Sequence, residues 1–382
     1  MKHLSLAMLM ATLLIGTIVA PSRTSGQTAD PSTQPTPAKL GLTATAVTLN
    51  YDKAPLKRVL DDLGRQMNTD LGQNEPPQDP FGNDTPLTIH LDHGSYWQAL
   101  ATIQLQPDVR LASSGQAVGM PLEDQPTYIG DLAKTHPQIE GPFYITSSQT
   151  TVNRFNNYGT VEVAGTNVGI RAVILSEPQV HILNWTGQHW LERCVDDRGN
   201  VLPAIPDEDL VRPIDYHDED SKVLRTYGFC MEAGLVAPAN LGAKIADLKG
   251  RLPVMIQTKS QAVEFDTGPN AAQQTKAFGA GSATLAKITT TPDGTFVDIV
   301  LRGAIFRQSP QTMRGVLSQV RFYASDDSIC LASFGKIEAA QDGSTHVTLG
   351  VYPAPKTLRW EAPLEIRPMV IPFELHDLAL TP

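Results

Sequence analysis

Residues 47–60 of this chain recur forty residues later as residues 87–100, and this repeat constrains the fold more than any other feature. The two segments read VTLNYDKAPLKRVL and LTIHLDHGSYWQAL. Each begins with apolar residues at every second position and then changes to helical spacing. Three residue types are identical in the two copies: Thr48 and Thr88, Asp52 and Asp92, Leu60 and Leu100. The repeat therefore predicts two strand-then-helix units.

Start signals support both predicted helices. The first begins at Ala54–Pro55, because proline is tolerated at the first helical position, where the N–H has no intrahelical partner. The second begins at Gly94–Ser95, where serine can cap the helix. A loop over Gln73–Pro86 joins the units, and two short extended runs follow over Val109–Leu122. Together these segments predict a small α/β module over residues 44–122.

The stretches 47–63 and 87–103, with residues 109–120 after them, resemble the short N-terminal domain shared by secretins and TonB-dependent transducers. The family pattern is strand, xPLxxxLxxL helix, connection, strand and helix of the form VTLxLxxxxLxxAL, then a closing hairpin. This resemblance implies a small periplasmic module that works through protein–protein contact. Residues 136–382 resemble no family, and they match neither a transducer plug and barrel nor a secretin pore.

The N-terminal residues predict export. Lys2 and His3 precede an apolar run over Leu4–Ala20, and small residues at Thr24–Gly26 provide a cleavage region, so residues 1–26 are predicted to be a signal peptide. A retained anchor is the alternative. Residues 27–43 are rich in Pro, Ser, Thr and Gln and predict a disordered linker. No later segment is long and apolar enough to span a bilayer. The expected location is the periplasm, or an association with the outer membrane.

Composition favours many short strands after the module. The chain contains 29 proline and 29 glycine residues, and turn signals recur throughout residues 136–382. The clearest is a hairpin with Ile288–Thr290 and Phe296–Leu301 on either side of Pro-Asp-Gly. We expect an α+β chain whose second part is all β: two immunoglobulin-like sandwiches over residues 136–262 and 263–382, or one large sandwich.

Charge and cysteine content limit the possible functions. The net charge of −10 and the absence of a basic stripe argue against nucleic-acid binding. Three cysteines are present, and an oxidising compartment would permit a Cys194–Cys230 disulfide. The favoured interpretation is that all three cysteines are small buried residues, and the disulfide is the alternative. None has the CxxC spacing of a zinc or thioredoxin-like site.

One histidine-containing segment, one acidic run and one pair of tryptophans are candidates for ligand binding. His90, Asp92 and His93 could offer metal ligands, but a polar outer strand face is the favoured interpretation, since a metal site needs three or four ligands. The acidic run Asp207–Asp220 lacks the glycine turn of a calcium loop and predicts a solvated loop. We therefore predict no metal and no cofactor. Trp185 and Trp190 could form a sugar-stacking platform, or they could pack in a sandwich core.

Catalytic motifs are absent from the sequence: GxSxG, HExxH and the glycine-rich phosphate loops do not occur. The favoured hypothesis is an exported non-catalytic envelope adaptor or scaffold that docks a protein partner through an exposed strand edge. A carbohydrate-binding sandwich protein is the first alternative. The least supported alternative is a hydrolase that assembles a site from distant residues such as Asp215, His217 and Cys230.

Overall fold

The computed structural model describes residues 41–67, 86–106, 137–156, 164–187, 189–205, 210–217, 223–268, 271, 273–292 and 294–380. Within these segments strands dominate and three α-helices occur, so the fold is mainly β with a small α+β part. None of the described helices has the length and apolar character needed to cross a bilayer. The predicted signal peptide (1–26), most of the predicted linker (27–43) and the predicted extended runs over Val109–Leu122 lie outside the described residues.

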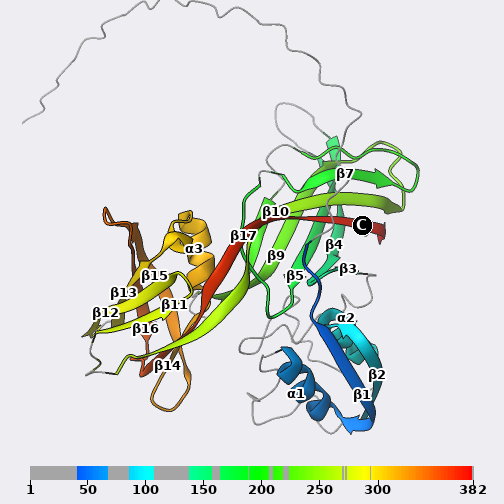
Figure 1. Ribbon diagram of the computed structural model, residues 1–382. Helices are drawn as coiled ribbons and strands as arrows, with labels where there is room; N and C mark the ends of the chain where they lie inside the picture. The colour runs from blue at the N-terminus through cyan, green and yellow to red at the C-terminus, as the bar shows by residue number, and fades with distance from the viewer. Residues whose placement is uncertain are drawn as a thin grey trace, which may run out of the picture. The chain divides into compact units, whose positions relative to one another are not determined.

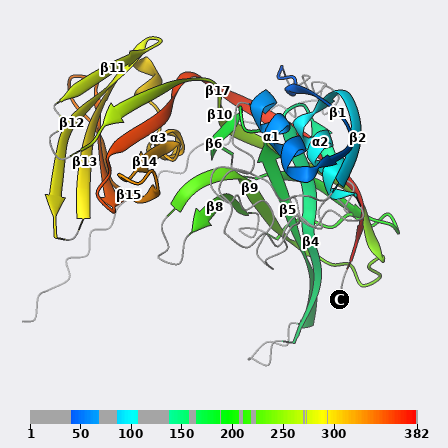
Figure 2. The ribbon, with the colours of Figure 1, turned by 90° about the horizontal axis from the view of Figure 1, so that it is seen from below.

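The repeat forms two strand-then-helix units, as predicted. The elements are β1 (Ala46–Pro55), α1 (Leu56–Met67), β2 (Pro86–Ser95) and α2 (Tyr96–Gln104). β1 and β2 pair antiparallel as a ribbon, and the helices pack beside it (Figures 1 and 2). Alternate residues of both strands are buried against the helices: Val47, Leu49, Leu87 and Ile89. The period-two pattern therefore gives the ribbon one apolar face and one polar face.

The repeat also extends to an unusual backbone conformation. Lys53 and His93, forty residues apart, have φ angles of 52° and 50°, and each lies where the register of the ribbon shifts. The Thr88 hydroxyl accepts the N–H of Lys53 at 3.1 Å, and the Thr48 hydroxyl accepts that of His93 at 3.3 Å. The repeated threonines thus stabilise two equivalent bulges. At each bulge, a residue other than glycine adopts the left-handed backbone conformation.

A five-stranded sheet forms one layer of the next part. Its order is β3 (Gln138–Glu140), β4 (Phe143–Asn156), β5 (Ala164–Ser176), β9 (Val223–Val236) and β8 (Leu210–His217). The opposing layer contains β6 (His181–Trp185), β7 (Leu191–Asp196) and parts of β10 (Lys244–Asp266) and β17 (Thr357–Ala379). Both layers contribute to one core, which includes Ile170, Met231, Leu248, Ile256 and Phe373.

The remaining strands form a curled sheet around a second core. They are β11 (Gln274–Phe278), β12 (Gly281–Thr291), β13 (Gly294–Arg302), β16 (Thr345–Tyr352), β15 (Ile329–Ala339) and β14 (Val320–Tyr323), in that order, followed by β17 and β10. The ring centroids of Phe278 on β11 and Trp360 on β17 are 5.5 Å apart, so distant strands of this sheet meet across its core. The predicted hairpin is confirmed, since Thr291 pairs with Gly294.

One helix interrupts the region that was predicted to be all β. A short 3-10 turn (η2, Ala304–Phe306) precedes α3 (Pro310–Leu317), which packs into the second core. The Ser309 hydroxyl accepts the N–H of Thr312 at 3.2 Å, and proline occupies the first helical position. This Ser-Pro start is a sequence-level helix signal that the prediction missed.

β10 and β17 pair antiparallel over almost their whole length, from Lys244 opposite Ala379 to Asp266 opposite Thr357 (Figure 1). Each strand contributes residues to both cores: Leu248 of β10 lies in the first core and Phe265 of β10 in the second. The predicted boundary between residues 262 and 263 therefore falls inside a continuous strand. The end of β17 returns to the first core.

The N-terminal module shares its core with the five-stranded sheet. Tyr144, Val173 and Leu175 of β4 and β5 pack among the buried residues of the ribbon and helices. The indole N–H of Trp97 donates to the carbonyl of Pro142 at 2.9 Å. The module is therefore attached through a buried apolar contact that also contains a directed hydrogen bond.

Candidate functional site

The two strands of the module differ at their outer edges. The side-chain amide of Gln66 on α1 accepts the N–H of Thr48 at 2.9 Å and donates to the Thr48 carbonyl at 2.8 Å. This amide therefore occupies the edge of β1 as a neighbouring strand would. Gln106 is the residue at the repeat-equivalent position, but α2 ends at Gln104. Among the described residues, no corresponding amide bonds to the backbone of Thr88, so β2 is the candidate docking edge.

The polar face of the ribbon does not gather metal ligands. His90 shares a 2.7 Å hydrogen bond with the Asn50 side chain, and Nε2 of His93 lies 3.6 Å from the Asp92 carboxylate at an exposed position. Asn50 is the cross-strand neighbour of His90, so the contact is an ordinary one across the ribbon. Among the described residues, His90, Asp92 and His93 do not form a cluster of metal-ligand atoms. This agrees with the prediction of a polar outer face.

Glu177, which follows β5, forms hydrogen bonds with Thr45 at the start of the module. Its side chain is buried and accepts the Thr45 N–H at 3.2 and 3.1 Å and the Thr45 hydroxyl at 2.7 Å. Burial raises the pKa of Glu177 above its usual 4.5, and the bonds from Thr45 only partly oppose this rise. The folded protein therefore holds the Glu177 proton more tightly than the unfolded chain does.

This raised pKa predicts a pH effect with a definite sign. The contribution of Glu177 to stability is greatest below pH 4.5 and falls as the pH rises through its folded-state pKa. We expect the Glu177→Gln variant to escape this loss. Its melting temperature minus that of the wild type should therefore increase between pH 4 and pH 7, as measured by scanning calorimetry at several pH values. A difference that stays constant or decreases with pH would contradict the assignment.

A charged cluster lies where β7, β10 and β17 pair. Asp247 is directly opposite His376, and Lys249 is directly opposite Glu374, so all four side chains share one sheet face. Leu248 and Leu375, which alternate with them, point into the first core. Arg193 of β7 pairs with Lys249 from the other side. Regular strand pairing therefore assembles carboxylates, an imidazole and two cations from distant parts of the chain.

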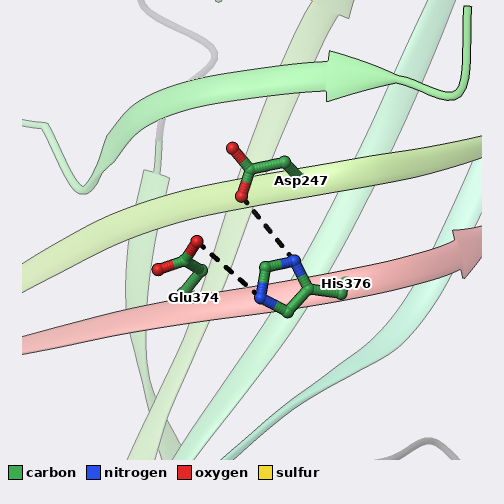
Figure 3. Close-up of side chains that lie close together, drawn as sticks. All are labelled: Asp247, Glu374 and His376. Carbon is green, nitrogen blue, oxygen red and sulfur yellow. Dashed lines mark ion pairs between the residues drawn. The ribbon is translucent and has the colours of Figure 1, made fainter.

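The imidazole of His376 lies between two carboxylates (Figure 3). Its Nδ1 is 3.7 Å from Oδ1 of Asp247, and its Nε2 is 3.7 Å from Oε1 of Glu374. The Lys249 ammonium is 2.7 Å from the same Glu374 oxygen, and this hydrogen bond is the main reason that the pKa of Glu374 is lowered. Arg193 approaches Oδ2 of Asp247 at 3.7 Å.

The thiol behind this cluster is not suited to nucleophilic chemistry. Cys194 is buried in the first core, and burial, with smaller contributions from Asp196 and Asp247, raises its pKa to about 12. A thiol with so high a pKa is almost entirely protonated at neutral pH, whereas the thiolate is the reactive form. The cluster therefore offers ligand atoms and charges rather than an activated nucleophile.

The structure does not contain the Cys194–Cys230 disulfide that was considered as an alternative, because no bond joins these thiols. Cys194 points into the first core, together with Phe229 and Met231 of β9. Cys230 lies between those two residues, so its side chain projects from the opposite face of β9, near Glu232. The favoured interpretation, that the cysteines are small buried residues, fits Cys194 and Cys330.

The predicted aromatic platform also disagrees with the structure. Trp190 is fully buried, stacks on Phe373 with centroids 5.8 Å apart and donates to the Glu232 carbonyl at 3.2 Å. Trp185 is partly buried against the same core. Exposed aromatic rings occur instead at Phe296 and Tyr352, which line a shallow groove of about 190 Å³ on the outer face of the second sheet.

The residues of the hydrolase alternative are only partly described. Asp215 and His217 lie on β8, and the predicted acidic loop is therefore a strand between residues 210 and 217. The side chains of these two residues lie outside the described part of the structure.

No protein-family model, curated protein or solved structure matches the chain.

Proposed function

We propose that this protein is an exported, non-catalytic protein of the bacterial cell envelope that binds another protein through its N-terminal module. The likeness of the repeat to the secretin and TonB short N-terminal domain supports this proposal. In this role the β-rich remainder acts as a scaffold. We propose that its two parts are immunoglobulin-like sandwiches. The proposed location is the periplasm, or an association with the outer membrane.

The observation that carries the proposal is the difference between the two ribbon edges. The Gln66 amide already satisfies the N–H and C=O of Thr48 on β1. An incoming extended segment would have to displace it there, whereas β2 lacks such a cap among the described residues. Strand addition uses main-chain hydrogen bonds for affinity and alternate side chains for selectivity. The proposed partner therefore presents an extended segment that pairs with β2.

Photo-crosslinking tests this docking edge. A photoreactive amino acid is placed at Thr88 of β2 in the full chain, in intact cells of the bacterium that makes the protein. We expect one discrete crosslinked product, identified as the same protein in replicate experiments. The matched control is Arg65, an exposed residue on α1 next to Gln66, which covers the edge of β1. Equal labelling from both positions, or no product from Thr88, would contradict the proposal.

Carbohydrate binding is the second candidate, but it requires different residues from those predicted. The buried Trp190 ring cannot stack on a sugar. Phe296 and Tyr352 are 40% and 65% exposed and flank Gly350, whose missing side chain leaves the groove between them. The groove is smaller than the roughly 300–1,000 Å³ typical of ligand pockets. The protein-binding role is therefore the function we favour.

A further inference from the structure

We infer that Asp247, Glu374 and His376 form a binding site for a divalent transition-metal ion, with zinc the best match. Each residue offers one ligand atom, and these atoms all lie within 4.8 Å of one another. Two carboxylate oxygens and one imidazole nitrogen suit zinc and similar ions, which accept both donor types. Calcium is a poorer match because it prefers six to eight oxygen ligands. This inference is independent of the proposed protein-binding role.

The strands hold the three side chains in place before any ion binds. Asp247 and His376 are cross-strand partners, and Glu374 precedes His376 by two residues on the same face of β17. The Glu374 N–H donates to the Gln138 side chain at 2.7 Å. The residues behind the cluster, Leu248 and Leu375, are buried. A site on paired strands keeps its geometry better than one on a loop.

A second observation points to a missing ligand. Oδ1 of Asp247 is buried and accepts no hydrogen bond from any described residue. A buried carboxylate oxygen without a donor is costly, since it has lost its water without gaining a partner. This oxygen faces the His376 ring at 3.7 Å. A cation bound by the cluster would offset the negative charge of the Asp247 carboxylate.

The backbone also favours one nitrogen of His376 as the ligand atom. Nδ1 lies 3.3 Å from the carbonyl of Ala246 and can donate its proton there. Ligating histidines commonly donate their other ring N–H to a carbonyl or carboxylate, which fixes the tautomer. Nε2 is then the free lone pair, and it faces Glu374 at 3.7 Å. Because zinc lies about 2.0–2.2 Å from such donors, the side chains must rotate to bring their ligand atoms around the ion.

Two neighbouring cations compete with the ion. The Lys249 ammonium is 2.7 Å from Glu374, and Arg193 is 3.7 Å from Asp247. A bound metal must weaken or displace the Lys249 contact to use the Glu374 oxygen. The site is therefore expected to bind more tightly when Lys249 is removed. A purely structural network of ion pairs would not behave in this way.

Isothermal titration of the chelator-treated full chain with Zn²⁺ at pH 7.5 tests the site. We expect one ion per chain, binding at least tenfold weaker in His376→Ala and in Asp247→Asn, and binding several-fold tighter in Lys249→Ala. The control is His346→Ala, an exposed histidine on β16 that lies beside Ser344, and its affinity should equal that of the wild type.

Circular dichroism confirms that each variant is folded, and the absorption spectrum of added Co²⁺ provides a second readout. Nitrogen and oxygen ligation at a low coordination number should give a visible band that is lost in His376→Ala. The inference is overturned if Zn²⁺ does not bind, if binding is unchanged in both His376→Ala and Asp247→Asn, or if Ca²⁺ binds more tightly than Zn²⁺. Unaltered affinity in Lys249→Ala would also overturn the proposed use of Glu374.

Discussion

Trp97→Ala is expected to destabilise the protein by about 3–5 kcal/mol and to loosen the N-terminal module, as removal of a buried tryptophan typically does. The ring is fully buried where the module meets the five-stranded sheet. Its centroid lies 5.0 Å from that of Tyr96 and 5.4 Å from that of Tyr144. Denaturant unfolding measures the loss, and hydrogen exchange locates it in residues 46–104.

The hydrogen bond of Trp97 contributes less than its packing. The Pro142 carbonyl also accepts the Glu177 N–H at 2.9 Å, so it keeps one partner when the indole is removed. Trp97→Phe, which retains an aromatic ring, should therefore cost only about 1–2 kcal/mol. Equal destabilisation by both variants would show that the hydrogen bond dominates. A normal hydrogen-exchange pattern in Trp97→Ala would show that the module is not held there.

Gly315→Ala is expected to destabilise the protein by about 3 kcal/mol or more, at the upper end of overpacking effects. In an exposed helix the same change would stabilise by about 1 kcal/mol. Here an added Cβ would lie 2.1 Å from the carbonyl oxygen of Leu183, part of the β6 backbone. β6 cannot move away easily, because it is paired with β10. The steric term therefore exceeds the gain in helix propensity.

Thermal and denaturant unfolding of Gly315→Ala measure this effect. Gln311→Ala is the matched control, since Gln311 is exposed on the same helix and should change stability by less than about 0.5 kcal/mol. A melting temperature for Gly315→Ala at or above that of the wild type would contradict the tight contact between α3 and β6.

Local patterns predicted those parts of the fold that depend on neighbours in sequence. The repeat gave both strand-then-helix units, and the Pro-Asp-Gly turn gave the β12–β13 hairpin. α3 was missed although Ser309 and Pro310 mark its start, because only eight residues carry its helical spacing. Short helices provide too few turns for a periodic signal.

The candidate metal cluster could not be found in the sequence, because its members come from strands far apart in the chain. Asp247 meets His376 only when β10 and β17 pair in one particular register. Shifting that register by one residue would turn one of the two side chains into the core. The same argument applies to the alternative Cys194–Cys230 disulfide, because spacing along the chain does not show from which sheet face each thiol projects.

The long β10–β17 ribbon has a consequence for how the chain can be divided. Since both strands run through two hydrophobic cores, neither core is built from an uninterrupted stretch of polypeptide. A fragment that stops after β10 would keep the five-stranded sheet but lose the returning strand that covers part of it. The β-rich region is thus expected to fold as one piece, even though it encloses two separate hydrophobic cores.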